Sequence, residues 1–322
     1  MTIVPVPVSG TLSSFAVNSG LRLYYEWWVP RAPRAMLVVV HGLAEHSGRY
    51  GALVRHCVAR GFGVALYDQR GHGQSDGPRG HFDHVQDLLS DLAQFVQFTK
   101  ESHPGVPVIL VGHSFGGQLA LNFVVRYAKG LRGLIVSSPN IALKMKLAWW
   151  KRLCGEQLYR IAPRLRVGNN IDPRWLSNDP DVVRAFEQDP RICRTLTLHA
   201  AREIMRNLDV VMALASRIHI PALFLHAGDD RICDPEATRR FFRRVPVTRK
   251  RLKIYEGMQH EIFNEVKRAA VFADVEEWLT ELLQTSPAAE ARPESADEAA
   301  VAAPRSYTLG RGERWTGHGN LG

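Results

Sequence analysis

Apolar runs of strand length alternate with segments of helical periodicity along most of the chain. Six near-continuous apolar runs predict buried β-strands, at residues 35–42, 61–68, 107–114, 131–138, 222–228 and 250–257. A further run at 21–29 follows the turn Asn18-Ser19-Gly20 and predicts one arm of a hairpin. Between these runs, segments such as 84–102 place their apolar residues on one helical face. Strands that are apolar throughout and separated by helices predict an α/β fold with a mostly parallel central sheet flanked by helices.

The alternation is interrupted once and ends before the chain does. Residues 140–215 have no strong strand pattern and are basic, aromatic and helical in character, and the strand-helix alternation resumes at Ala222. We therefore predict a core formed by residues 1–139 and 216–284, with residues 140–215 as an inserted helical lid. The segment 285–322 is rich in alanine, proline, glutamate and then glycine, and its low apolar content predicts a disordered C-terminal tail.

Composition narrows the class of protein. With 322 residues, of which 45% are hydrophobic, the chain can bury a large core. The four cysteines have no paired spacing, which predicts free thiols in a reducing compartment. No apolar run approaches the roughly 18 residues of a membrane-spanning helix, so we predict a cytoplasmic protein. The net charge of +9 would suit nucleic acid or an anionic membrane, but no nucleic-acid-binding motif accompanies it, so no nucleic-acid partner is expected.

The segment VILVGHSFGG, residues 108–117, places Ser114 in a G-x-S-x-G pattern between a predicted strand and a predicted helix. A serine hydroxyl is a weak nucleophile at neutral pH, so it must project toward both a base and a substrate carbonyl. The flanking glycines permit a tight corner and leave room beside the serine. The N-terminus of the following helix would direct its dipole toward a developing oxyanion. This context predicts a nucleophile elbow rather than an ordinary glycine-rich turn.

The acid and the base of such a site are expected downstream of the serine, in that order. Asp229, Asp230 and Asp234 follow one predicted strand, and His260 follows the next. Both groups come after the carboxyl ends of parallel strands, where α/β sheets place their sites. We therefore predict His260 as the base, while the residues alone leave the three aspartates open as its partner.

Two loops near the predicted site carry further polar groups. In HGLAEHSGRY, residues 41–50, the main-chain N–H of Leu43 is a candidate to form an oxyanion hole with that of Phe115. A simple turn followed by a capped helix is compatible with that role. In the loop 67–80 we interpret three polar side chains as groups that hold the loop together, namely Asp68, Arg70 and His72.

Six segments in the same part of the chain carry a family resemblance. In chain order they are HGLAEHSGRY, YDQRGHGQSDG, GHSFGG, DPRICRTLTL, GDDRICD and IYEGMQHEIFNE. Together they resemble the monoacylglycerol lipase and lysophospholipase family of α/β-hydrolases, which is grouped with the serine aminopeptidase-like hydrolases. The resemblance implies the α/β-hydrolase fold and a catalytic triad in which Ser114 matches the nucleophile, Asp230 the acid and His260 the base. Leu43 and Phe115 fall where the family draws its oxyanion N–H groups.

The resemblance also bears on the substrate. Glu45 and Arg49 fall where the family surrounds the polar glycerol end of its site, or they form a structural ion pair within the loop. Two positions depart from the family pattern. Ala44 stands where glycine is usual, and Phe263 stands where animal members tend to have a histidine near the glycerol.

The expected activity is hydrolysis of a carboxylic ester through an acyl-serine intermediate, with no cofactor and no metal. The substrate class is a monoacylglycerol-like lipid ester with a single acyl chain. The same triad also serves lysophospholipases, thioesterases and peptidases, so these remain alternatives. A further alternative is a non-catalytic binding protein on the same fold. The oligomeric state is not predicted.

The predicted lid begins with a basic and aromatic stretch, residues 143–167, that contains Trp149 and Trp150. Apolar and aromatic side chains beside a basic face are typical of a helix at a membrane surface. We therefore predict a lid that admits the acyl chain and touches the membrane peripherally. The alternative is that the two tryptophans pack into the core.

Overall fold

The computed structural model describes residues 8–144, 157–169 and 171–284. The chain divides after Gln284, and the description below concerns the part before that point. The expectations for Trp149, Trp150 and the tail 285–322 fall outside the described residues.

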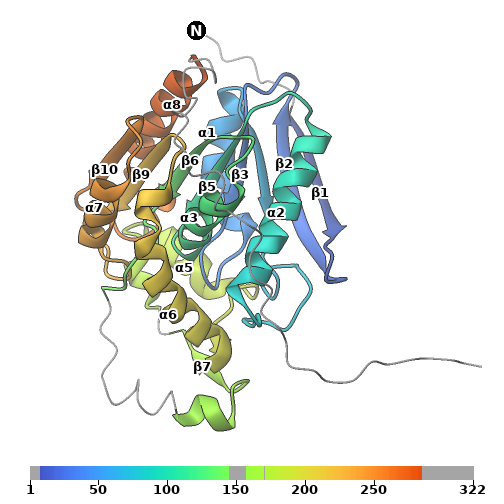
Figure 1. Cartoon of the computed structure of the whole chain (residues 1–322), viewed down its shortest axis with the longest axis vertical. Helices are drawn as coiled ribbons and strands as arrows, with labels where there is room; N and C mark the ends of the chain where they lie inside the picture. Colours follow the sequence, from blue (N-terminus) through green and yellow to red (C-terminus); the bar gives the residue numbers. More distant parts are fainter. Residues whose placement is uncertain (1–7, 145–156, 170, 285–322) are drawn as a thin grey trace, which may run out of the picture. The chain divides into compact units, whose positions relative to one another are not determined.

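An eight-stranded sheet forms the centre of this unit (Figure 1). Its strands are β1 (Val8–Ala16), β2 (Arg22–Pro30), β3 (Met36–Val40), β4 (Gly63–Tyr67), β5 (Val108–His113), β6 (Leu131–Ser137), β9 (Ala222–Ala227) and β10 (Lys250–Tyr255). Their order across the sheet is β1-β2-β4-β3-β5-β6-β9-β10. The pairs β1–β2 and β2–β4 are antiparallel, and all other neighbours are parallel. The sheet is therefore mostly parallel, as predicted.

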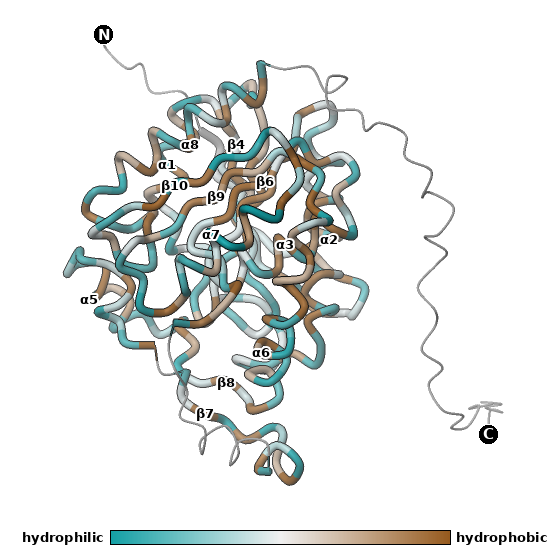
Figure 2. Tube along the Cα trace, turned by 60° about the vertical axis from the view of Figure 1, so that its left-hand side comes forward, coloured by the Kyte–Doolittle hydropathy of each residue, from teal (hydrophilic) through white to brown (hydrophobic). Residues whose placement is uncertain are grey.

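Helices cover both faces of the sheet. Helices α1 (Gly51–Ala59) and α8 (Arg268–Gln284) pack on one face. The other face is covered by α2 (Val85–Ser102), α3 (Phe115–Tyr127), α6 (Leu198–Ala213) and α7 (Pro235–Arg244). Successive residues of β3 point to opposite faces of the sheet. Leu37 and Val39 lie on the face covered by α1 and α8, and Val38 lies on the face covered by α2, α3, α6 and α7. Figure 2 shows the hydrophobic colour concentrated in central strands such as β6 and β9. The near-continuous apolar pattern follows from burial on both faces.

The segment 140–215 contains more than helices. It includes β7 (Arg166–Gly168) paired antiparallel with β8 (Thr195–Thr197), together with α5 (Pro180–Gln188) and α6. Two short 3-10 turns also lie in or at the end of this segment, Pro173–Trp175 and Ala215–Arg217, and two others lie elsewhere in the protein, Ser47–Tyr50 and Ile262–Asn264. The two three-residue strands are too short to give a periodic signal in the sequence. The assignment of this segment as a lid stays a prediction.

No helix among the described residues combines the length and the apolar character needed to cross a bilayer.

Candidate active site

The turn between β5 and α3 presents Ser114 with a main-chain φ of +53°, a left-handed conformation that is costly for any residue except glycine. The neighbouring glycines are required for close approach. A Cβ at Gly116 would lie 2.1 Å from the carbonyl oxygen of Val40, and one at Gly112 would lie 2.5 Å from the carbonyl oxygen of Gly116. The strained main-chain conformation is therefore that of Ser114, and the glycines allow β5 and α3 to approach closely. This is the geometry of a nucleophile elbow.

Three side chains form a hydrogen-bonded chain at the carboxyl ends of the strands. The Oγ atom of Ser114 lies 2.8 Å from Nε2 of His260. The Nδ1 atom of His260 lies 2.7 Å from Oδ2 of Asp230. Ser114 is 9% exposed, whereas Asp230 is fully buried. Contact with the carboxylate assigns the ring proton to Nδ1, so the lone pair of Nε2 faces the serine hydroxyl. The imidazole can accept the proton of that hydroxyl.

The charges of Asp230 and His260 stabilise each other. Burial raises the pKa of Asp230, but the nearby imidazoles of His260 and His226 outweigh it, and the pKa is lowered below its ordinary value. Burial lowers the pKa of His260, but the carboxylate of Asp230 outweighs it, and the pKa is raised. Asp230 therefore stays ionised and supports the charged form of the imidazole. A raised pKa makes His260 a stronger proton acceptor than a free imidazole.

The structure shows which of the three candidate aspartates contacts His260. Asp229 is exposed, and Asp234 caps the first turn of α7 by accepting the N–H of Glu236 at 3.0 Å. Asp230 alone among them contacts His260, and its other oxygen accepts the N–H groups of two following residues, Ile232 and Cys233. These bonds hold the carboxylate in one orientation.

His226 on β9 is a neighbour of Asp230 that the sequence analysis missed. Its Nε2 atom lies 3.2 Å from Oδ2 of Asp230, and its Nδ1 lies 2.9 Å from Oγ1 of Thr238. The ring is fully buried. One histidine in an apolar strand is the only signal in the sequence, and it does not distinguish this role from ordinary packing.

The loop after β3 closes over the nucleophile. A Cβ at Gly42 would lie 2.8 Å from Oε1 of Glu45 and 3.2 Å from Cβ of Ser114, so any larger residue would displace these side chains. The N–H of Leu43 follows directly, and Phe115 provides the first N–H of α3. Within the described part of the chain, neither N–H has an acceptor. Two free donors beside the serine, together with the N-terminus of α3, suit an oxyanion.

Glu45 and Arg49 belong to a buried ionic cluster in the same loop. The Nε atom of Arg49 lies 3.3 Å from Oε2 of Glu45, and its Nη2 lies 2.5 Å from Oε2 of Glu261. Burial and the charge of Glu261 raise the pKa of Glu45 to about 7, whereas Arg49 holds the pKa of Glu261 down despite burial. Glu261 is therefore the ionised partner of the arginine. The sequence analysis missed Glu261, which follows the predicted base directly.

A cavity of about 10 Å³ adjoins this cluster, which is about the space of one water molecule. It is lined by Glu45, Tyr50, His113, Glu261, Phe263 and Asn264. Polar groups line most of it, and Phe263 is the apolar wall where the resemblance implies histidine in animal members. The cavity can therefore hold one water molecule against the ionic cluster.

The loop 67–80 is held by its own polar side chains, in agreement with the interpretation from sequence. Asp68 accepts the N–H groups of Ser47 and Gln74, at 2.8 and 2.7 Å. Arg70 binds both oxygens of Asp91, at 2.6 and 2.7 Å. His72 is buried, and burial lowers its pKa to about 3, so the ring is neutral.

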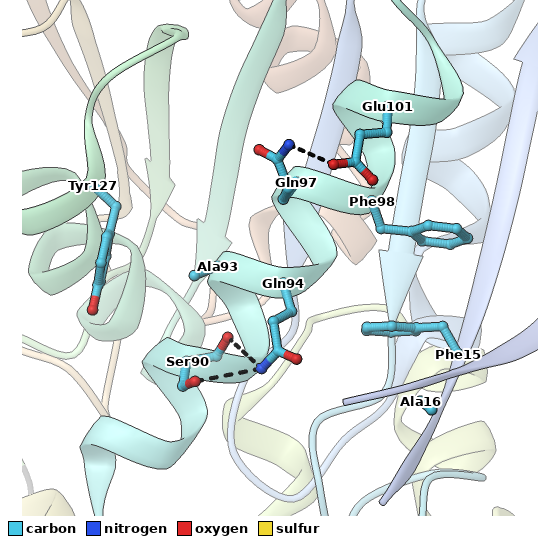
Figure 3. A pocket seen from close by; sticks show the side chains of 9 residues that line it. All are labelled: Phe15, Ala16, Ser90, Ala93, Gln94, Gln97, Phe98, Glu101 and Tyr127. Carbon is cyan, nitrogen blue, oxygen red and sulfur yellow. Dashed lines mark hydrogen bonds between the residues drawn. The ribbon is translucent and has the colours of Figure 1, made fainter. Parts of the chain in front are cut away.

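A wider hollow of about 640 Å³ lies elsewhere, between β1 and α2 (Figure 3). Its polar groups bond to each other: Gln97 donates to Glu101 at 2.7 Å, and Gln94 donates to the carbonyl of Ser90 at 3.2 Å. None of Ser114, Asp230 and His260 lines this hollow. Size alone therefore does not identify a site in this molecule.

Cys233 completes a group of potential metal ligands with Asp230 and His260, whose ligand atoms lie within 4.8 Å of each other. Burial raises the pKa of the Cys233 thiol well above its ordinary value, which disfavours the thiolate that a metal needs. The carboxylate and imidazole already bond to each other. This group is better suited to proton transfer than to a metal.

The fold and the geometry together define a serine hydrolase of the α/β-hydrolase type. A family profile described as "Serine aminopeptidase, S33" matches residues 31–267, and the chain belongs to this family.

Individual proteins extend the comparison. "Uncharacterized abhydrolase domain-containing protein" of Dictyostelium discoideum is 34% identical over 87% of this chain, which spans only 30% of that relative. "Monoacylglycerol lipase" of Mycolicibacterium smegmatis is 32% identical, and the alignment covers 84% of this chain and 98% of the relative. The crystal structure of Paleococcus ferrophilus monoacylglycerol lipase superposes with a TM-score of 0.72 and 29% identity, covering 85% of this chain and 99% of that one.

Proposed function

We propose that this protein hydrolyses monoacylglycerol-like lipid esters through an acyl-serine intermediate. The observation that carries the proposal is the continuous chain from Ser114 through His260 to the buried Asp230, with distances of 2.8 and 2.7 Å. The similarity to monoacylglycerol lipases supports the substrate class. The reaction requires no redox step, so the chain's own acid-base groups are sufficient for it.

In the first half of the reaction, Nε2 of His260 takes the hydroxyl proton of Ser114 while Oγ bonds to the ester carbon. The carbonyl oxygen becomes an oxyanion and accepts the N–H groups of Leu43 and Phe115. When the intermediate collapses, the bond to the alcohol oxygen breaks and His260 protonates that oxygen. In the second half, a water molecule gives a proton to His260 while its oxygen attacks the acyl carbon. When this intermediate collapses, the bond between Oγ and the acyl carbon breaks, His260 returns the proton to Oγ, and the fatty acid leaves.

The cluster of Glu45, Arg49 and Glu261 would surround the alcohol portion of the substrate. Its buried charges favour a polar alcohol portion over a second acyl chain, because an apolar chain would leave those charges without polar neighbours. This arrangement supports a single-chain lipid ester, with lysophospholipids as the alternative that shares one acyl chain.

Substitution of Ser114 by alanine tests the chemistry. We expect the change to lower kcat by several orders of magnitude, on the order of 10⁶ in a comparable triad, and His260→Ala to do the same. The double variant should lose little more, because triad members act together. Ser90→Ala, a serine on α2, is the matched control and should leave kcat unchanged. Additive losses in the double variant, or fluorophosphonate labelling that survives Ser114→Ala, would contradict the proposal.

A substrate series tests the class of ester. Monoacylglycerols of graded chain length should give higher kcat/KM than lysophospholipids, acyl thioesters or peptide amides. Preference for the phosphate-bearing lipids would reassign the enzyme as a lysophospholipase. Preference for amides would contradict the ester assignment while leaving the triad intact.

We also propose that the segment 140–215 forms a lid that contacts the membrane from which the substrate comes. Ile161, Leu165 and Leu158 are 84%, 44% and 39% exposed. Basic residues are interleaved with them, at Arg160, Arg164 and Arg166. Exposed apolar side chains beside cationic ones favour an anionic lipid surface.

Vesicle binding tests this contact. Leu158→Ser with Ile161→Ser should weaken sedimentation with vesicles that contain phosphatidylserine, and salt should weaken that of the parent protein. Leu12→Ser is the control, because Leu12 is 58% exposed on β1. Equal binding by all three proteins would remove the membrane contact from the proposal.

A further inference from the structure

Two histidines and a glutamate meet between α2 and α6. His84 precedes the first residue of α2, while His199 and Glu203 stand four positions apart on α6, so both project from one face of that helix. One potential ligand atom from each residue lies within 4.8 Å of the other two. We propose that these three side chains bind a divalent transition-metal ion, with Zn²⁺ as the cation that the ligand set favours.

The ligand types support this choice. Two imidazoles and one carboxylate form a set that zinc accepts, with a water molecule in the fourth position. Tetrahedral zinc has bonds of about 2.0–2.1 Å, so its ligand atoms stand roughly 3.3 Å apart. Nδ1 of His84 is already 3.8 Å from Oε2 of Glu203. The side chain of His84 is 68% exposed, which leaves it free to turn inward by the small remaining distance.

His199 is held as metal-binding histidines usually are. Its Nε2 atom lies 2.5 Å from the main-chain carbonyl of Asp83 and therefore carries the ring proton. That contact leaves the lone pair on Nδ1, and a carbonyl partner of this kind orients the ring and increases its basicity. The hydroxyl of Tyr159 lies 3.3 Å from Nδ1 and would move aside for the ion.

The surroundings carry charges of both signs. Asp87 accepts the main-chain N–H of His84 at 3.0 Å, and Asp83 lies 3.2 Å from the neighbouring His81. Arg206 approaches the other oxygen of Glu203 at 3.6 Å but is 63% exposed and can swing into solvent. Oε2 of Glu203 remains available to a cation.

A bound ion would join α6 to the start of α2. Both helices pack against each other and against α3, which begins next to Ser114. The ion is not part of the hydrolytic reaction, so this proposal stands or fails independently of the proposed function. Its direct consequence is a higher unfolding temperature, because a ligand that binds only the folded state stabilises that state.

Zinc titration of the full-length protein tests the site. Calorimetry should detect one high-affinity Zn²⁺ per chain, and zinc should raise the unfolding temperature. Glu203→Gln and His84→Ala should each weaken binding at least about tenfold, because loss of outer-shell partners alone costs 10–100-fold. Glu203→Gln preserves the size of the side chain, so it avoids the folding defect that His199→Ala would cause by releasing the carbonyl of Asp83.

His56→Ala is the matched control. Nε2 of His56 lies 3.3 Å from Oε2 of Glu276 on another part of the surface, and no third ligand joins them among the described residues, so the loss of His56 should leave zinc binding unchanged. X-ray absorption of the zinc complex should detect nitrogen and oxygen ligands only. No zinc uptake, equal affinity in Glu203→Gln and His84→Ala, or a sulfur ligand from the Cys233 group would each overturn the proposal.

Discussion

Asp230 differs from Asp229 and Asp234 because its side chain alone contacts His260. Its Oδ2 atom contacts Nδ1 of His260 at 2.7 Å, whereas Asp234 caps α7 and Asp229 is exposed. We predict that Asp230→Asn lowers kcat about 10⁴-fold, because an amide permits the wrong imidazole tautomer. Asp229→Asn and Asp234→Asn are matched changes and should cost less than tenfold. A larger loss from Asp234→Asn, measured as kcat on one soluble ester, would show that the acid is misassigned.

The pH dependence of kcat/KM follows from the charges around His260. The imidazole accepts the serine proton only when it is neutral, so activity falls as pH falls through its pKa. Burial lowers that pKa, and Asp230 and Glu261 more than compensate and raise it. We predict that Glu261→Gln lowers the pKa of His260 and moves the acid limb of kcat/KM to lower pH. Glu276→Gln, next to Arg60 on the surface, should leave the profile unchanged. A shift to higher pH in Glu261→Gln would contradict the argument.

Single residues also show where prediction from sequence ended. A motif and chain order were enough to select Ser114 and His260, but Asp230 was selected by family resemblance, because three neighbouring aspartates carry the same local signal. Glu261 could not be recognised, since its role depends on Arg49, which is distant in sequence. Ala44, where the family usually has glycine, has a φ of +71°, which explains the usual residue.

At the scale of elements, the contact between β3 and α3 depends on Gly116. A Cβ there would lie 2.1 and 2.5 Å from two main-chain oxygens, which cannot turn away as a side chain could. We predict that Gly116→Ala destabilises the protein by about 1–3 kcal/mol and also lowers kcat, because the displaced end of β3 leads directly into the loop that carries Leu43. Thermal unfolding and ester hydrolysis measure the two effects.

Gly51→Ala provides the control for this change. A Cβ at Gly51 would meet only the flexible end of Arg55, at 3.4 Å, and the residue is helical. Its stability should be unchanged or slightly increased, because alanine favours a helix over glycine. Equal losses in the two variants would argue that close approach is not the reason for Gly116.

The elements themselves were largely predictable, because strands buried on both faces leave unbroken apolar runs. All six predicted buried strands are present, and the predicted helix 84–102 is observed as Val85–Ser102. The predicted hairpin is present, with β2 as the predicted arm, but the bounds of its other arm, β1, were not predicted because its sequence, VSGTLSSFA, lacks both a continuous and an alternating apolar pattern. It is an edge strand with one partner, so burial constrains it less.

At the scale of the whole molecule, α8 is the last described element that contributes buried residues to the hydrophobic core. Its buried residues Val271, Phe272, Trp278 and Leu279 pack beneath the sheet, and the chain divides after Gln284. We predict that deletion of residues 285–322 leaves the unfolding temperature and kcat/KM unchanged. Deletion from Arg268 onward should abolish folding, since it exposes the apolar face that α8 covers. Circular dichroism melting and ester hydrolysis distinguish these outcomes, and a destabilised shorter deletion would contradict the first.

The separation of Ser114 from His260 along the chain has a consequence for synthesis on the ribosome. The two residues contact each other although they are 146 positions apart in the sequence. At about 5–20 residues per second, the serine leaves the ribosome roughly 7–30 seconds before the histidine does. Throughout that interval the nascent chain carries a hydroxyl with no base to activate it. A ribosome that stalls or terminates early therefore releases an inert fragment, and cellular esters meet the reactive serine only in a finished protein.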